Sequence, residues 1–289
     1  EAPPAHFYHF RWRLYPWLEV CIQQFKDLST PKIMGILNIT PNSFYDGGKY
    51  SLEKNAISKV DKMLKEGATF IDIGAYSSKP NAEFVSEEEE LKRIIPVVKT
   101  LIKEFPETLL SIDTFRSSVA QECINNGAAL INDISAGNLD EKMIEVIASN
   151  NVPYIMMHLR GTPQTMQNQT NYENLIKEMI LYFSDKISKA RNLGIHDLII
   201  DPGFGFSKTT DQNFEILSNL ELFKMLDLPI LTGISRKSMI YKTLDTNPEE
   251  ALNGTTVLNT IAITKGANII RVHDVKEAIE CVKLYEKLG

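Results

Sequence analysis

The sequence predicts a (β/α)8 TIM barrel, an α/β fold in which eight parallel strands form a closed cylinder inside eight helices. Two observations lead to this prediction. From Lys32 onward, short apolar runs rich in β-branched residues alternate eight times with longer amphipathic segments, which is typical of βα units. The chain also has 289 residues, and a single barrel commonly needs about 250. A doubly wound open sheet is the alternative fold.

The eight expected strands are almost continuous in apolar character, as parallel strands covered on both faces are. They span residues 32–39, 69–75, 109–113, 129–134, 154–158, 198–203, 230–235 and 269–273. No long linker interrupts them, so residues 20–289 are expected to form one domain. Residues 1–19, with clustered aromatic residues, look unlike the rest of the chain. We expect them to be an N-terminal extension of uncertain origin.

The residues at the helix boundaries agree with this division. Ser86 followed by Glu89 resembles a capping box at the start of the helix expected over 86–105, whose first turn is acidic. Gly67 and Gly127 follow expected helices, where a left-handed cap is favoured.

The composition excludes several classes of function. A net charge of −6 and a pI near 5.5 argue against a nucleic-acid binder or a protein that binds anionic membranes. No apolar run approaches the length that crosses a bilayer. Cys21, Cys123 and Cys281 lie far apart and are expected to be free thiols in a reducing cytoplasm. The expected partners are therefore small molecules.

Polar residues stand at the ends of all eight expected strands. The carboxyl ends of barrel strands meet at one mouth, which is where the chemistry of this fold takes place. Capping or turn formation could explain any one of these residues, but not a full ring of them. In strand order they are Asn38, Asp72, Asp113, Asn132, His158, Asp201, the group Ser235–Lys237, and Arg271 with His273.

The residue types in this ring indicate two kinds of ligand. Asp113, Asn132 and Asp201 offer hydrogen-bond acceptors and one amide, which suit a flat heterocycle with several N–H donors. The loop 203–208 is rich in glycine but lacks P-loop spacing, and Phe206 could form an apolar wall there.

The last two strands supply cations, at the part of a barrel that frequently binds phosphate. These are Arg236, Lys237, Arg271 and His273. Asn38 is next to them in a closed barrel and could be a metal or oxyanion ligand. The site therefore suits a heteroaromatic substrate that carries a phosphate or diphosphate, with group transfer as the reaction class.

Seven segments, in order, resemble the signatures of the dihydropteroate synthases, which are pterin-binding enzymes. The first is Met34–Phe44 followed by Asp46–Gly48, and the others are 71–74 with 77–80, 111–114, 131–134, 201–206, 233–238 and 271–275. The resemblance covers about residues 21–285. It implies that the protein condenses 6-hydroxymethyl-7,8-dihydropterin diphosphate with p-aminobenzoate, giving 7,8-dihydropteroate and diphosphate in folate biosynthesis.

The resemblance also implies a role for each matching residue. The pterin would be held by Asp113, Asn132, Met157, Asp201 and Lys237. The p-aminobenzoate would contact Ser78, Lys79, Pro80, Phe206, Lys237 and Ser238. The diphosphate would be held by Asn38, Arg271 and His273, with Asn38 acting through Mg²⁺ as the metal ligand. Asp113, Asp201, Lys237, Arg271 and His273 would be the catalytic residues. A cytoplasmic homodimer that is a target of sulfonamides is implied as well.

One segment departs from the family pattern. The family usually has Gly-Gly-Glu-Ser-Thr-Arg-Pro-Gly after the second strand, whereas residues 74–81 are Gly-Ala-Tyr-Ser-Ser-Lys-Pro-Asn. Lys79 replaces a planar guanidinium, and the two groups are not equivalent where a bidentate contact is made. We therefore expect an altered or weakened site for p-aminobenzoate with the chemistry intact.

Two alternative functions remain open from the sequence. A barrel methyltransferase acting on methyltetrahydrofolate would share the acceptors Asp113, Asn132 and Asp201, but it has no need for Arg271 and His273 as a diphosphate clamp. A pterin-binding barrel without catalytic activity is the other alternative, and the altered segment 74–81 is its only support.

Overall fold

The computed structural model describes residues 28–39, 48–76 and 85–288, without the side chains of 48–51. Ser78, Lys79 and Pro80 lie outside the described residues, as does the expected extension over residues 1–19.

Eight parallel strands form the centre of the molecule, and their order is β6-β5-β4-β3-β2-β1-β8-β7. An isolated parallel bridge between Ile200 and Ile230 joins the two outermost strands, so the sheet closes on itself. The predicted TIM barrel is therefore confirmed. The strands are β1 Lys32–Asn38, β2 Phe70–Gly74, β3 Leu109–Asp113, β4 Leu130–Asp133, β5 Tyr154–Met157, β6 Leu198–Asp201, β7 Leu231–Thr232 and β8 Ile269–Val272.

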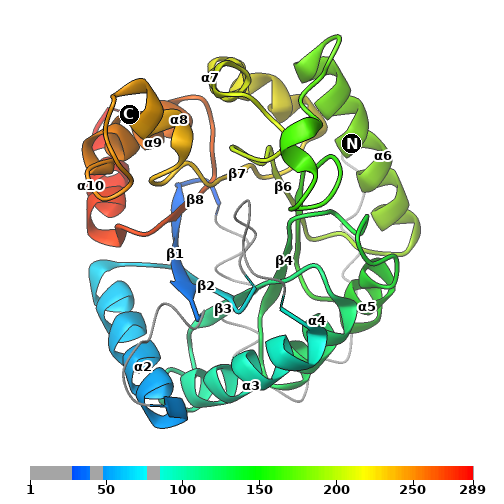
Figure 1. The fold of residues 1–289 in the computed structure, drawn as a ribbon, viewed down its shortest axis with the longest axis vertical. Coiled ribbons are helices and arrows are strands. Elements are labelled where there is room, and N and C mark those ends of the chain that lie inside the picture. Colours follow the sequence, from blue (N-terminus) through cyan, green and yellow to red (C-terminus); the bar gives the residue numbers. More distant parts are fainter. Residues whose placement is uncertain (1–27, 40–47, 77–84, 289) are drawn as a thin grey trace, which may run out of the picture.

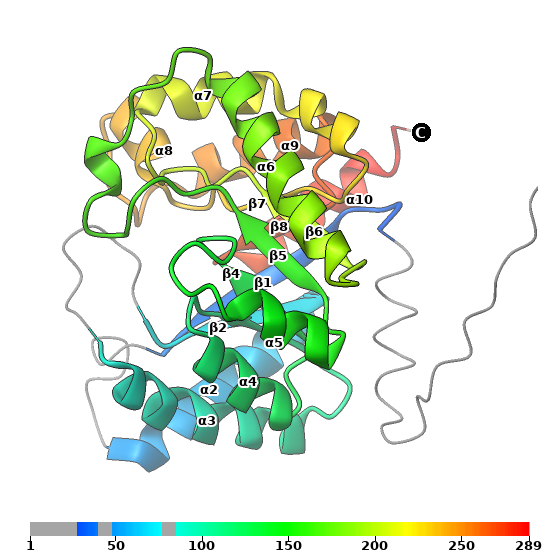
Figure 2. The same cartoon turned by 90° about the vertical axis from the view of Figure 1, so that its right-hand side faces the viewer.

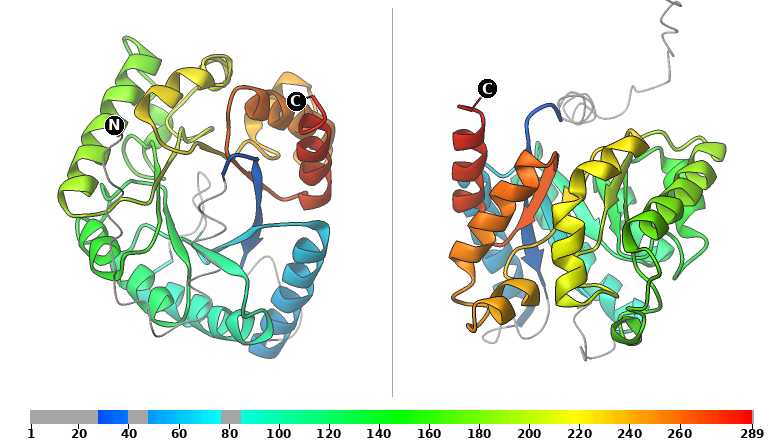
Figure 3. Two further views of the ribbon diagram at one scale, coloured as in Figure 1. Left: turned by 180° about the vertical axis from the view of Figure 1, so that it is seen from behind. Right: turned by 90° about the horizontal axis from the view of Figure 1, so that it is seen from above.

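Helices surround this barrel on all sides (Figure 1). The left view of Figure 3 shows the same ring from behind, and Figure 2 shows the barrel from the side, with β5 between α5 and α6. The α-helices are α2 Gly48–Glu66, α3 Glu87–Glu104, α4 Ser117–Asn125, α5 Met143–Asn150, α6 Leu175–Asn192, α7 Thr210–Ser218, α8 Ser238–Thr243, α9 Leu252–Thr264 and α10 Val275–Tyr285. Within the described ranges, two 3₁₀ helices are η2 Met166–Asn168 and η3 Leu220–Leu226.

The expected boundary residues have the expected conformations. The Ser86 hydroxyl accepts a hydrogen bond from the Glu89 amide at 3.2 Å and caps α3. Gly67 and Gly127 follow α2 and α4 with φ values of +108° and +100°. Strand β7 is shorter than expected because the chain turns at once, with the Lys237 amide bonded to the Ile234 carbonyl at 3.1 Å. No helix in the described ranges is long and apolar enough to cross a membrane.

An apolar floor fills the lower part of the barrel. One buried side chain from each strand contributes to it: Met34, Phe70, Leu109, Leu130, Ile155, Ile199, Leu231 and Ile269. Side chains two residues apart in a strand point to the same face. The residues two positions beyond the floor therefore also point into the barrel. Five of these eight positions are polar, and the set is Ile36, Asp72, Ser111, Asn132, Met157, Asp201, Gly233 and Arg271.

The residues that alternate with these inward-facing positions point outward, against the helices. The Asp133 carboxylate accepts hydrogen bonds from the Tyr154 hydroxyl at 2.6 Å and from the Ser135 amide at 2.8 Å. The imidazole of His158 meets the edge of the Tyr182 ring on α6, with ring centroids 4.8 Å apart. The strand register thus places Asn132 and Met157 in the mouth and Asp133 and His158 behind it.

Candidate active site

A buried ion cluster lies directly above the apolar floor. The Arg271 guanidinium donates from Nε to Asp72 Oδ2 at 2.5 Å and from Nη2 to Asp113 Oδ2 at 2.7 Å. Asp72 also accepts from the Ser111 hydroxyl at 2.5 Å and from the Asn132 amide at 3.1 Å. These five side chains come from β2, β3, β4 and β8. Asp72 is fully buried and connects Arg271 to Asn132.

The two carboxylates share one guanidinium, and this affects how Asp113 titrates. Burial raises the pKa of Asp113 to about 7, with Arg271 opposing the shift and Asp72 adding to it. Burial by itself would lower the pKa of Arg271, but the attraction of Asp72 and Asp113 is larger and raises it. Arg271 therefore stays charged, and Asp113 changes its charge near neutral pH.

A second pair of opposite charges, Lys237 and Asp201, lies across the mouth. Burial lowers the pKa of Lys237 to about 8, and Asp201 opposes this shift. Burial also raises the pKa of Asp201, which accepts a hydrogen bond from the Gly203 amide at 2.8 Å. The Lys237 ammonium donates to the Phe204 carbonyl and lies 4.7 Å from the centre of the Phe206 ring.

Apolar side chains form the wall on the β4 to β6 side of the mouth. Met157 belongs to a buried cluster with Ile134, Leu159 and Met166, and Phe206 packs against that cluster. A flat ring could therefore lie with one face on apolar atoms and its edge toward Asp113, Asn132 and Asp201. This arrangement matches the heterocycle predicted from the sequence.

Ser235 and His273 face each other at the ends of β7 and β8. The Ser235 hydroxyl accepts from the His273 amide at 3.2 Å and lies 3.0 Å from Nδ1 of the same imidazole. When the hydroxyl donates its own proton to Nδ1, the neutral ring carries its proton on Nε2. Nε2 is then a hydrogen-bond donor, which suits an anion.

Arg236 does not join this group, although the sequence placed it among the phosphate-binding cations. Its guanidinium forms a two-bond pair with the Asp274 carboxylate, both bonds at 2.8 Å, and donates to the carbonyls of Pro248 and Glu249. Arg236 therefore fastens the loop after β7 to the loop after β8. It orients Lys237 and His273 without facing the mouth.

Asn38 ends β1 at the open rim, where its side chain is exposed. A side chain at Gly74 would meet Asp113 Oδ2 at 3.6 Å and Asn38 Oδ1 at 3.7 Å, so both oxygens border the same space. Such oxygens suit Mg²⁺, which usually takes one or two from the protein and the rest from water and phosphates. Among the described residues no cluster of three or more His, Cys, Asp or Glu side chains could hold a metal.

The structure thus brings together most of the predicted site. Asn38, Asp113, Asn132, Met157, Asp201, Phe206, Lys237, Arg271 and His273 surround one mouth, and Ser238 begins α8 beside Lys237. Ser78, Lys79 and Pro80 lie outside the described residues.

Sequence reasoning noted Asp72 as a polar residue of the second strand but gave it no role. Asp72 lies two residues after the floor residue Phe70 and therefore points into the barrel, and this spacing could have identified it.

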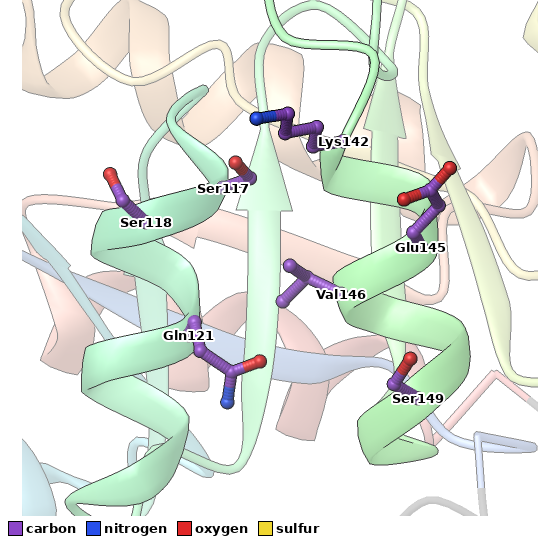
Figure 4. A pocket seen from close by; sticks show the side chains of 7 residues that line it. All are labelled: Ser117, Ser118, Gln121, Lys142, Glu145, Val146 and Ser149. Carbon is purple, nitrogen blue, oxygen red and sulfur yellow. The ribbon is translucent and has the colours of Figure 1, made fainter.

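A separate hollow lies on the outer wall between α4 and α5 (Figure 4). Ser117, Gln121, Lys142 and Ser149 are among the residues that line it. The Ser117 amide at the start of α4 already donates to the Asp140 carboxylate at 2.7 Å. The hollow contains none of the strand-end residues and is not part of the mouth.

Comparison with known proteins identifies the family. The model of the pterin-binding enzymes matches residues 34–273. The dihydropteroate synthase of Escherichia coli K12 is 42% identical over 262 residues, which is 90% of this chain and 92% of that protein.

Two solved structures agree with this match. Dihydropteroate synthase from Yersinia pestis, in a complex with a sulfonamide drug, superposes with a TM-score of 0.85 at 40% identity, covering 91% of this chain and 95% of that one. The enzyme from Clostridium difficile, in the presence of pteroic acid, gives a TM-score of 0.85 at 36% identity, covering 90% and 97%. The chain belongs to the pterin-binding enzyme family and, within it, to the dihydropteroate synthases.

Proposed function

We propose that the barrel mouth transfers the pterin-methyl group of 6-hydroxymethyl-7,8-dihydropterin diphosphate to the amino group of p-aminobenzoate. The products are 7,8-dihydropteroate and diphosphate, so the enzyme is a transferase of folate biosynthesis. The observation that carries this proposal is the division of the mouth into two sides. Arg271 and His273 lie on one side, and an apolar wall with Lys237 and Phe206 lies on the other.

The pterin is proposed to bind above the floor, between these two sides. The carboxylates of Asp113 and Asp201 and the side chain of Asn132 would meet the N–H and carbonyl groups of its edge. Met157 would lie against its ring. Both carboxylates are buried, so their negative charge acts in a medium of low polarity and would stabilise the positive charge that develops on the pterin methylene.

The diphosphate is proposed to leave toward β8 and β1. Arg271 Nη1, the third nitrogen of the guanidinium, has no hydrogen-bond partner among the residues described. It could bind a phosphate oxygen while Asp72 and Asp113 hold the other two nitrogens. His273 would donate from Nε2. Asn38 would hold Mg²⁺, and this ion would neutralise charge on the diphosphate.

The p-aminobenzoate is proposed to lie over Phe206, Lys237 and Ser238, with Ser78, Lys79 and Pro80 completing its site. Its amino nitrogen forms the new C–N bond to the methylene as the C–O bond to the diphosphate breaks. The amine needs only to be held in line for this attack. No nucleophilic side chain is therefore needed.

A homodimer and a cytoplasmic location are further parts of the proposal. Leu222 and Met225 on η3, and Val257 on α9, are 47%, 71% and 49% exposed, and such apolar side chains could be covered by a second copy. Sedimentation velocity at several concentrations would test the dimer.

Cys123 and Cys281 are free thiols, which are compatible with a reducing compartment.

Product formation tests the proposed reaction. Purified protein with the pterin diphosphate, p-aminobenzoate and Mg²⁺ is expected to yield a product with the mass of dihydropteroate, and omission of Mg²⁺ should abolish it. The Lys237→Ala and Arg271→Ala variants should both lose most of the activity. Pterin binding without any product would instead favour a non-catalytic barrel. Methyl transfer from methyltetrahydrofolate would favour the alternative enzyme class.

The altered segment after β2 gives a second prediction. Because Lys79 cannot form the bidentate contacts of an arginine, the double variant Ser78→Thr/Lys79→Arg should lower the KM for p-aminobenzoate and increase inhibition by sulfonamides. The kcat at saturation should stay close to that of the wild type. Equal KM values and equal inhibition in both proteins would contradict the idea that this segment weakens the aryl site.

The titration of Asp113 and Lys237 gives a third prediction, which concerns the pH dependence of kcat/KM for the pterin diphosphate. The activity should rise as Asp113 ionises, with a pKa of about 7, and fall as Lys237 loses its proton, with a pKa of about 8. Asp113→Asn should remove the acidic limb and leave the basic one. A profile of the wild type that is flat between about pH 6 and 9 would be inconsistent with these roles.

A further inference from the structure

Lys208 is a buried lysine that the proposed mechanism does not use. It lies in the loop between β6 and α7, and it is 4% exposed. Its ammonium donates to the carbonyls of Phe206 at 2.8 Å and Gly203 at 3.0 Å, and it lies 3.0 Å from Nδ1 of His158. Burial lowers the pKa of Lys208 well below its usual range, and the charge of Asp201 opposes this shift. In its charged form the side chain has three N–H donors, which these three partners satisfy. No carboxylate is among its hydrogen-bond partners in the described residues.

The loop 203–207 is folded around this ammonium. Gly203, Gly205 and Ser207 have φ values of +70°, +82° and +47°. These values lie in the left-handed region, which residues other than glycine rarely adopt. A Cβ at Gly203 would lie 2.4 Å from the His158 carbonyl oxygen. The backbone is therefore turned so that the carbonyls of Gly203 and Phe206 converge on Lys208. A side chain with no N–H group would leave both carbonyls without this donor.

His158 connects the ammonium to the neighbouring loops. Burial, followed by the nearby charge of Lys208, lowers the pKa of His158 well below its usual range, so the ring is neutral and its Nδ1 can accept from the charged form of Lys208. Beside it, the Ser207 hydroxyl accepts from the Arg160 amide at 3.1 Å, and the Tyr172 hydroxyl donates to the Ser207 carbonyl at 3.0 Å. The outer side of the loop is thus fixed against the segment after β5.

The inner side of the same loop faces the mouth. The Phe204 carbonyl accepts from Lys237, and the Phe206 ring lies 4.7 Å from that ammonium. A Cβ at Gly205 would meet Lys237 Cδ at 3.3 Å, so the loop backbone passes close to this side chain. The position of the loop therefore sets where Lys237 and Phe206 meet.

We propose that Lys208 is a positioning residue for the second substrate: its ammonium holds the loop 203–207 so that Phe206 and Lys237 form the surface on which p-aminobenzoate lies. Lys208 touches no substrate itself and acts through Phe206 and the Phe204 carbonyl. The inference rests on the proposed function, because it assigns Lys208 to the aryl half of that site.

Steady-state kinetics of Lys208→Met tests this inference. Methionine has a similar length and no N–H donors, so the loop would lose its central contact. A misplaced contact surface can reduce binding by about tenfold to a hundredfold. We expect the KM for p-aminobenzoate to rise by at least about tenfold, with the Kd of the pterin diphosphate changed by less than about threefold. Lys186→Met is the matched control, since Lys186 is a half-buried lysine on α6 that bonds Asn138, and its KM should not change.

A double-mutant cycle separates positioning from general stability. If Lys208 acts through Phe206, the variant Phe206→Ala already loses the surface, and adding Lys208→Met should raise the KM little further. If the double variant instead raises the KM by the product of the two single effects, the residues act independently and the proposal is overturned. So would a Lys208→Met protein that is less stable to urea but has an unchanged KM.

Lys208→Gln, which keeps an N–H donor without the charge, provides a second variant if Lys208→Met does not fold. It should give a smaller rise in the KM for p-aminobenzoate. Failure of both variants to fold would show a structural role and overturn the proposal. A wild-type protein that forms no dihydropteroate would instead disprove the proposed reaction itself, so the two failures are distinguishable.

Discussion

Arg271 donates to Asp72 at 2.5 Å and to Asp113 at 2.7 Å, and the other polar groups of the mouth are arranged around this contact. Removal of one partner from a buried ion pair typically costs about 3–5 kcal/mol, because it leaves the other charge uncompensated. One guanidinium cannot fully balance two carboxylates. Burial raises the pKa of Asp113 to about 7, with the charge of Asp72 adding to the shift, and positive charge developing on a bound pterin would favour the ionised form of Asp113.

The barrel makes this cluster possible because it supplies a dry floor and a fixed register. The floor residues Phe70 and Ile269 are fully buried, and the polar side chains Asp72 and Arg271 follow them by two positions. Charges held in this way interact more strongly than they would in water and need little rearrangement during the reaction. The site therefore depends on strand pairing as much as on the residues that meet the substrate.

The sequence was sufficient to predict the barrel, all eight strands and most of the mouth, because strand ends in a closed parallel barrel must converge. It was less informative about the direction of each side chain. Asp72 lies within a strand whose residues are otherwise apolar or glycine, and only its register relative to Phe70 shows that it faces Arg271. Arg236 is next to Lys237 in the sequence, but its φ of +55° turns it toward Asp274.

Lys208 illustrates a different limit of sequence reasoning. The loop 203–208 was recognised as rich in glycine, and Phe206 was expected to form a wall. However, nothing in the local sequence indicates that the carbonyls of Gly203 and Phe206 converge on the lysine. That arrangement depends on His158, fifty residues earlier, as the third partner of the ammonium.

The most direct test of the central claim compares two ligands that differ only in the diphosphate. The affinities of 6-hydroxymethyl-7,8-dihydropterin and of its diphosphate would be measured by calorimetry for the wild type and for Arg271→Lys. The lysine keeps the charge between Asp72 and Asp113 but loses the planar fork. The account predicts a fall of about tenfold or more in affinity for the diphosphate and little change for the alcohol. Equal losses for both ligands, or no loss for either, would contradict the assignment of Arg271 to the leaving group.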